Sequence, residues 1–145
     1  MLAKIAAYTE RHRSYTAVDR LLETTAAEPT QAAEAMASVV AHALTSVPCA
    51  AVFVPTTTGA TPRMLSRFNP AVWIVAVSRD GAVCQGLTFS SGVHPVHVAR
   101  QPERWRDFIA EWIREHQVPG ALALFAAGPS ADHPDDNHRL EVVRL

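Results

Sequence analysis

Apolar residues recur along the chain in two patterns, short continuous runs and runs with helical spacing. Three continuous apolar runs have the length and the aliphatic, partly β-branched composition of buried parallel strands, at 50–54, 71–77 and 121–126. A last run at 140–145 alternates in character, which is typical of a strand at the edge of a sheet. Shorter strand candidates lie at 87–89 and 93–98.

Helical spacing fills the segments between these strands. The clearest amphipathic helix is predicted at 102–116, where Trp105, Phe108 and Trp112 recur at three- and four-residue intervals. A helix at about 31–45 is apolar almost all round, which predicts that it is buried against a sheet. Shorter helical segments are predicted at 1–13, 14–23, 60–68 and 82–86.

This alternation of strands and helices predicts an α/β fold. We expect a three-layer α/β/α sandwich around a mostly parallel five-stranded sheet with an antiparallel edge strand. The 145 residues form one domain of ordinary size, 1–145, with 1–29 as a helical lead-in. The helical pattern starts at Met1 without a preceding loop, so we expect a chain cut from a longer one or encoded separately from it.

Composition narrows the functional classes. A formal net charge of −1 gives no basis for attraction to nucleic acid or to a membrane. The sequence has no signal peptide and no 18-residue apolar run, so we expect a soluble cytoplasmic protein with reduced thiols. Cys49 and Cys84 stand among apolar residues and are interpreted as buried structural cysteines.

A hydroxyl-rich turn follows the first buried strand and precedes a helix. This threonine turn, residues 56–61, consists of Thr56, Thr57, Thr58, Gly59, Ala60 and Thr61. Such a turn can hold a phosphate, because the first N–H groups of the helix point outward and the positive end of its dipole lies there. The same residue types also suit an N-cap cluster that serves only its helix, and both interpretations stay open. No Walker motif is present.

Three loops are expected to meet at one edge of the sheet. They follow three of the predicted parallel strands and comprise residues 56–61, 78–81 and 128–137. Ligands of open α/β sheets bind beyond the carboxyl ends of the strands, so the sequence predicts the ligand site there.

Histidine and aspartate give weak candidates for a metal site. His94 and His97 lie three apart in an extended segment, which places them on opposite faces. The last loop could bind a divalent ion through Asp132, His133, Asp135, Asp136 and His138. We interpret that loop as solvated and polar, although a small enzyme that uses its histidine and aspartate is a third functional hypothesis.

The order of the motifs resembles the C-terminal α/β domain of pyruvate kinase. The matching pieces are the strand and turn AAVFVPTTTGATPRMLSRFNP, then VWIVAVSRD, then GLTFSSGVHPVHV. The closing segments ALALFAAG and NHRLEVVRL and the opening helix MLAKIAAYTE are also similar to that family. The resemblance therefore covers nearly the whole chain.

The resemblance implies a regulatory or interface domain of the glycolytic enzyme. The catalytic site of pyruvate kinases belongs to a (β/α)8 barrel, for which 145 residues leave no room. We therefore expect no catalytic residues, metal or cofactor in this chain and no activity from it alone. Its expected partners are the catalytic barrel, a second copy of the chain and an allosteric effector such as fructose 1,6-bisphosphate. A free-standing module that binds a phosphorylated metabolite is the alternative.

The resemblance also assigns residues to an effector pocket. The threonine turn would hold one phosphate through Thr56, Thr58, Gly59 and Thr61, and Trp105 and the Gly128 loop would be near a second. Some family members place an arginine in this turn, where this chain has Ala60. This departure favours a single-phosphate site over a bisphosphate site.

Overall fold

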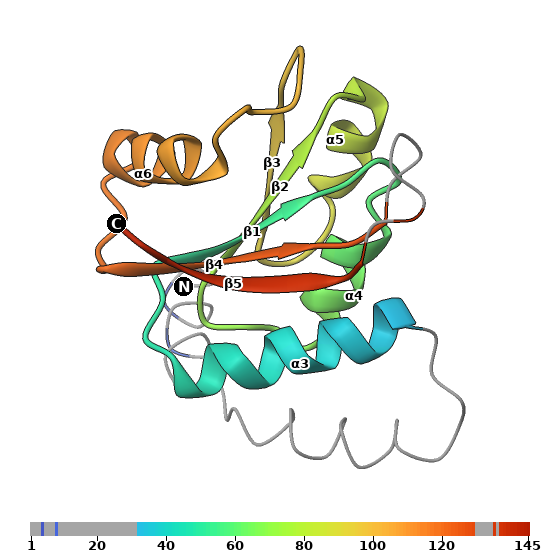
Figure 1. The fold of residues 1–145 in the computed structure, drawn as a ribbon. Coiled ribbons are helices and arrows are strands. Elements are labelled where there is room, and N and C mark those ends of the chain that lie inside the picture. Colours follow the sequence, from blue (N-terminus) through green and yellow to red (C-terminus); the bar gives the residue numbers. More distant parts are fainter. Residues whose placement is uncertain (1–3, 5–7, 9–31, 130–134, 136) are drawn as a thin grey trace.

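The computed structural model describes residues 4, 8, 32–129, 135 and 137–145, and Figure 1 shows their arrangement. Helices and strands alternate along the chain as expected. Its elements are α3 (Ala32–Ser46), β1 (Ala51–Pro55), α4 (Ala60–Arg67), β2 (Trp73–Ser78), α5 (Gly81–Leu87), β3 (Val93–His97), α6 (Trp105–Glu115), β4 (Leu122–Ala127) and β5 (Arg139–Arg144).

The sheet has five strands in the order β3-β2-β1-β4-β5. Strand β1 lies at the centre and runs parallel to β2 and β4, with Val52 opposite both Ile74 and Leu124. Strand β3 is parallel to β2, whereas β5 pairs antiparallel with β4 at the edge. The prediction of a mostly parallel sheet with an antiparallel edge strand is confirmed.

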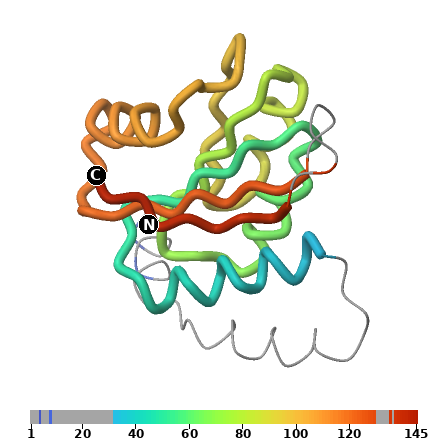
Figure 2. The backbone as a smooth tube through the Cα atoms, in the orientation of Figure 1, coloured from blue at the N-terminus to red at the C-terminus, as the bar shows by residue number. Residues whose placement is uncertain are grey.

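Side chains of the central strand alternate between two separate cores. Val52 and Val54 pack in the core formed with α3, α4 and α5. Ala51 and Phe53 pack in the opposite core, beneath α6. The tube in Figure 2 shows α6 and α3 on opposite sides of the sheet. The central strand is apolar throughout because both of its faces are covered.

The residues after α5 do not form the strand expected at 87–89. Leu87 is buried and ends α5, whereas the Phe89 side chain is 94% exposed. The N–H groups of Thr88 and Ser90 donate to the carbonyls of Gln85 and Leu87, so this segment continues as turns. Local hydrogen bonds therefore stabilise turns here instead of a strand, and the next strand along the chain is β3.

Helix α3 packs in the core with one side, whereas the apolar residues on its other side are exposed, so the expected burial holds for one face only. Ala37, Val40 and Ala41 face the core, but Val39 is 54% exposed. Alanine has the highest helix propensity and little apolar surface, so an alanine-rich helix can form at a partly exposed position. The helices expected at 1–13 and 14–23 lie outside the described residues, apart from Lys4 and Tyr8, which are helical. None of the helices formed by the described residues is long and apolar enough to span a membrane.

Candidate functional site

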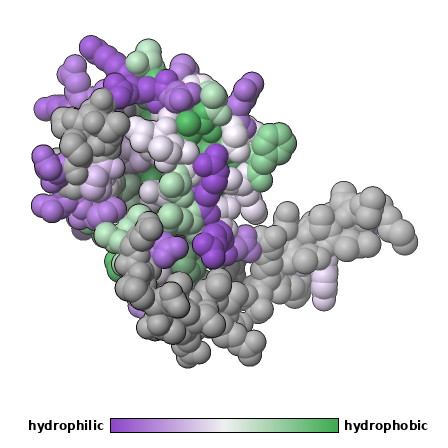
Figure 3. All heavy atoms as spheres, turned by 90° about the vertical axis from the view of Figure 1, so that its right-hand side faces the viewer, coloured by the Kyte–Doolittle hydropathy of each residue, from purple (hydrophilic) through white to green (hydrophobic). Residues whose placement is uncertain are grey.

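A cavity of about 1120 Å³ opens at the carboxyl edge of the parallel strands. Its lining includes residues of the loops after β1, β2 and β4, the three loops expected to meet there, and also residues of the segment after β3. Figure 3 looks onto this side of the molecule and shows hydrophilic side chains along its top and left, beside a paler area. Parallel strands bring their carboxyl ends to one edge, so loops distant in sequence share one cavity.

The threonine turn forms one wall of this cavity. Thr56, Thr57, Thr58, Ala60 and Thr61 line it, and the intervening Gly59 is buried at the N-cap of α4 with φ +78°. Glycine adopts this left-handed conformation without strain, which lets the strand turn sharply into the helix.

Backbone hydrogen bonds fix the shape of the turn. The Thr56 N–H donates to the Val77 carbonyl at 2.9 Å, which ties the start of the turn to β2. The Gly59 N–H donates to Thr56 Oγ1 at 2.8 Å, and the Ala60 N–H donates to Thr58 Oγ1 at 3.3 Å. Because these hydroxyl oxygens already accept a bond, their protons can be donated elsewhere.

Part of the hydrogen-bonding capacity of the turn is unused. Among the described residues, the Thr61 N–H in the first turn of α4 has no hydrogen-bond partner. The first turn of α4 also contains no acidic residue that would offset the positive end of its dipole. The N-cap interpretation of the threonines therefore accounts for two N–H groups and leaves this one available to a ligand.

The loop after β2 brings one acidic residue, Asp80, to the cavity lining, where the N-terminus of α5 engages its carboxylate. Asp80 caps α5, since one carboxylate oxygen accepts from the N–H groups of Ala82 at 2.8 Å and Val83 at 3.4 Å. Ser78 is 2% exposed, and its Oγ accepts from the Asp80 N–H at 3.2 Å. Asp80 is therefore the N-cap residue of α5.

Aromatic and basic side chains form another part of the cavity lining. The ring centroids of Trp105 and Phe125 lie 4.9 Å apart, and the Arg139 guanidinium carbon lies 5.2 Å from the Phe125 centroid. His138 sits against Gly128, where an added Cβ would approach its Nδ1 to 2.6 Å. Arg139, which also pairs with Glu141 at 3.4 Å, gives this part of the lining a positive charge, so the cavity suits an anion with an apolar or ring-shaped part.

The structure brings most of the expected site residues together. Trp105 and Gly128 line the same cavity as the threonine turn, and only Gly59 lies behind the lining. The sequence interpretation missed Phe125 and Arg139. The antiparallel return of β5 places Arg139 at this edge, because Arg139 pairs with Ala127 at the end of β4. The alternating run at 140–145, predicted as an edge strand, was the sequence signal that could have indicated it.

The histidines do not form a metal site within the described residues. No group of three or more His, Cys, Asp and Glu side chains in that part of the chain is placed to hold an ion. His94 and His97 point to opposite faces of β3, as expected: the His97 ring contacts the Arg79 carbonyl, and His94 contacts α6. Asp132, His133 and Asp136 of the candidate loop lie outside the described residues.

The cysteines have the environment of structural thiols. Burial raises the pKa of the Cys49 thiol, and burial together with the Asp80 carboxylate raises that of Cys84. Cys84 is buried, whereas Cys49 is only partly so. Raised pKa values keep both thiols protonated and weakly reactive at neutral pH.

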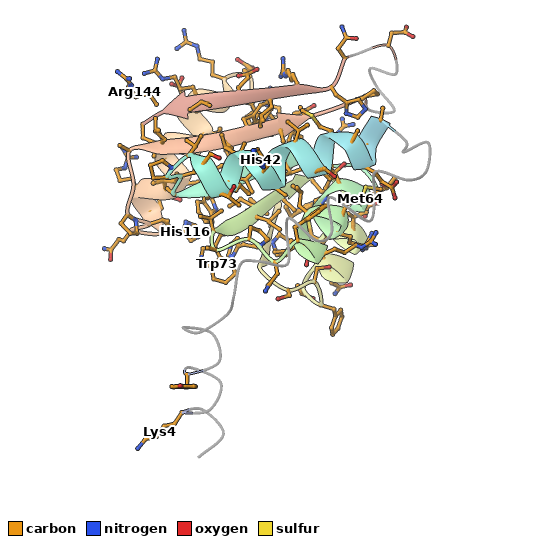
Figure 4. All side chains as sticks on the ribbon, turned by 90° about the horizontal axis from the view of Figure 1, so that it is seen from below. Lys4, His42, Met64, Trp73, His116 and Arg144 are labelled. Atoms are coloured by element: carbon orange, nitrogen blue, oxygen red, sulfur yellow. The ribbon has the colours of Figure 1, made fainter. Side chains whose placement is uncertain are left out.

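His94 belongs to an aromatic cluster at the opposite edge of the sheet. Its ring lies 6.3 Å from Trp73, 5.3 Å from Trp112 and 5.4 Å from His116, centroid to centroid. Seen from below, Trp73 and His116 lie at this same edge (Figure 4). Burial, and secondly the charge of His116, lowers the pKa of His94 from its usual 6.5.

We expect His94 to make the protein less stable in mild acid. Because the pKa of His94 is lower in the folded chain than in the unfolded chain, its neutral form stabilises the fold above pH 6.5. This contribution decreases as the pH falls below 6.5 and is lost below the folded-state pKa. Urea unfolding of the wild type and the His94→Gln variant at pH 7.5 and 5.0 measures it. The variant should lose less stability on acidification, and an equal loss in both proteins would contradict this role.

Comparison with known proteins identifies relatives of this chain. The family model described as pyruvate kinase, alpha/beta domain, matches residues 34–131. A pyruvate kinase from Thermococcus litoralis is 40% identical over 97 residues, which is 66% of this chain and 20% of that protein. A pyruvate kinase from Geobacillus stearothermophilus is 33% identical over 76 residues, 52% of this chain and 13% of that protein. The matched segment thus spans a fifth or less of these curated relatives.

Solved structures with the same fold include pyruvate kinase from Cryptosporidium parvum. Its complex with ADP superposes with a TM-score of 0.81 at 20% identity and covers 97% of this chain and 29% of that one. A second crystal structure of the enzyme from that organism has a TM-score of 0.71 at 18% identity, with coverages of 91% and 26%. At these identities the superpositions support the fold alone.

Proposed function

The chain belongs to the pyruvate kinase family as its α/β domain, and we propose that it is a non-catalytic regulatory domain whose threonine turn binds an anionic or phosphorylated effector. The observation that carries this proposal is the cavity whose lining the threonine turn shares with Trp105 and Arg139. The turn offers hydroxyl protons and a helix N-terminus to a phosphate, and the aromatic wall offers an apolar surface to the remainder of the effector.

The charges around the cavity support one anion at the turn. The Asp80 carboxylate is engaged by the N-terminus of α5, whereas the N-terminus of α4 has no acidic residue. Charge-assisted hydrogen bonds from the turn would contribute about 1–3 kcal/mol to binding. Ala60 contributes no charge of its own, so a single phosphate on the turn is favoured over two.

Replacement of Thr58 and Thr61 together by alanine should weaken binding of a sugar phosphate roughly tenfold or more, because two hydroxyl groups at the turn are lost. Isothermal titration calorimetry with a panel of sugar monophosphates and bisphosphates measures the change. Thr88→Ala is the matched control, because its hydroxyl bonds locally to the Gln85 carbonyl outside the cavity. Equal binding by the double variant and the wild type would remove the turn as the site.

The same titrations can test the proposed partner. A regulatory domain of this family would act on a pyruvate kinase catalytic barrel, so a separately produced barrel should bind this chain, and an added effector should change the affinity. Effector binding without any interaction with the barrel would favour the alternative, a free-standing module for a phosphorylated metabolite.

A further inference from the structure

Arg63 contacts the threonine turn without lining the cavity. It lies on α4, and its Nη1 donates a hydrogen bond to the Thr58 carbonyl at 2.9 Å. Arg63 is absent from the cavity lining, although Thr58 is part of it. The guanidinium therefore reaches the turn without occupying the space of a ligand.

Two glycines leave room for this guanidinium. A Cβ on Gly59 would lie 2.9 Å from Nη1 and 3.2 Å from Cζ of Arg63. A Cβ on Gly86, in α5, would lie 3.2 Å from Nη2. The planar group thus fits between the turn that follows β1 and the helix that follows β2. Side chains at either glycine would push it from this position.

We propose that Arg63 is a positioning residue of the effector site, which holds the threonine turn in the form that accepts an anion. This inference rests on the proposed function of the turn. A free carbonyl at Thr58 could rotate toward the cavity, where its oxygen would repel an anion. The hydrogen bond from Arg63 keeps that oxygen engaged, and the guanidinium adds a positive charge behind a turn that has no basic side chain of its own.

The geometry separates this role from simple helix stabilisation. A basic residue in the first turn of a helix is unfavourable to the helix dipole, so Arg63 gains nothing from its place on α4. Arg67, on the same helix, lies in the last turn, where the dipole favours a cation. The two arginines are both exposed and carry the same charge, yet only Arg63 bonds to the turn among the contacts of the described residues.

The test compares Arg63→Gln and Arg63→Lys with the control Arg67→Gln, using inorganic phosphate as the probe. Amide chemical shifts of Gly59, Ala60 and Thr61 are followed by NMR during the titration. We expect Arg63→Gln to weaken phosphate binding roughly fivefold to tenfold and to speed hydrogen exchange at Gly59 and Ala60. Arg63→Lys should be intermediate, since it keeps the charge but loses the planar fork. Arg67→Gln should stay within about twofold of the wild type.

The outcomes distinguish the inference from the function on which it rests. If the wild type shows no phosphate-dependent shifts at the turn, the proposed effector site itself fails. If the wild type binds phosphate and Arg63→Gln binds it equally well, only the role of Arg63 is overturned. Equal weakening in Arg63→Gln and Arg67→Gln would also overturn it, because the effect would then be a general one of net charge. Urea unfolding of each variant shows whether lost binding reflects lost folding.

Discussion

Replacing Phe53 with alanine is expected to lower the free energy of unfolding by about 3–5 kcal/mol. Phe53 lies in the middle of β1, the central strand, and its side chain is 0% exposed. Its ring makes edge-to-face contacts with Trp112, at 5.4 Å between centroids, and with Phe108, at 6.4 Å. The substitution removes a buried ring and these aromatic contacts, and it leaves a cavity between the sheet and α6.

Urea unfolding followed by tryptophan fluorescence measures this loss. Phe89→Ala is the matched control, because it makes the same chemical change at a side chain that is 94% exposed. The control should change the free energy of unfolding by no more than about 0.5 kcal/mol. A loss below about 1 kcal/mol for Phe53→Ala would contradict the packing of α6 on the sheet.

The parallel core could be predicted from the sequence because its strands are apolar on both faces. Side chains of the run at 50–54 alternate between two cores, with Val52 in one and Phe53 in the other. Every position of the strand is therefore apolar, and the continuous apolar run is easy to recognise in the sequence. The helix at 102–116 was equally clear, because its exposed face is charged.

The errors occurred where local chemistry outweighed the apolar pattern. The segment 87–89 was expected to be a strand, but the N–H groups of Thr88 and Ser90 donate to carbonyls three residues earlier, and the chain turns. In α3, the many alanines suggested a buried helix, although small side chains are also stable in a helix that is partly exposed to water. Hydrophobic composition alone did not distinguish these cases.

The sequence predicted where the site lies in the fold, but not which side chains contact one another there. The rule for parallel strands placed the threonine turn, the 78–81 loop and Gly128 at one edge. The rule does not predict the position of Arg139, because this residue lies on the antiparallel edge strand. Nor does it indicate Arg63, whose position depends on two glycines 27 residues apart in the sequence, Gly59 and Gly86.

Replacing Ala60 with glutamate should stabilise the helix and prevent effector binding. Ala60 is exposed, begins α4 and lines the cavity. A carboxylate at the first position of a helix is favoured by the dipole, by about 0.3–1 kcal/mol. The same carboxylate would lie beside a bound phosphate and repel it by about 1–3 kcal/mol for each pair of unit charges, so the affinity should fall at least roughly tenfold.

Urea unfolding and calorimetry with a sugar monophosphate at low salt measure these two effects, and Ala60→Gln is the control for side-chain size. Because the stability is expected to rise and the effector affinity to fall, the variant distinguishes the two interpretations of the threonine turn. If its residues serve only as a cap for α4, Ala60→Glu should raise stability and change no binding. If the turn is an anion site, the variant that folds better must bind worse. Unchanged affinity in Ala60→Glu would place the anion elsewhere on the domain.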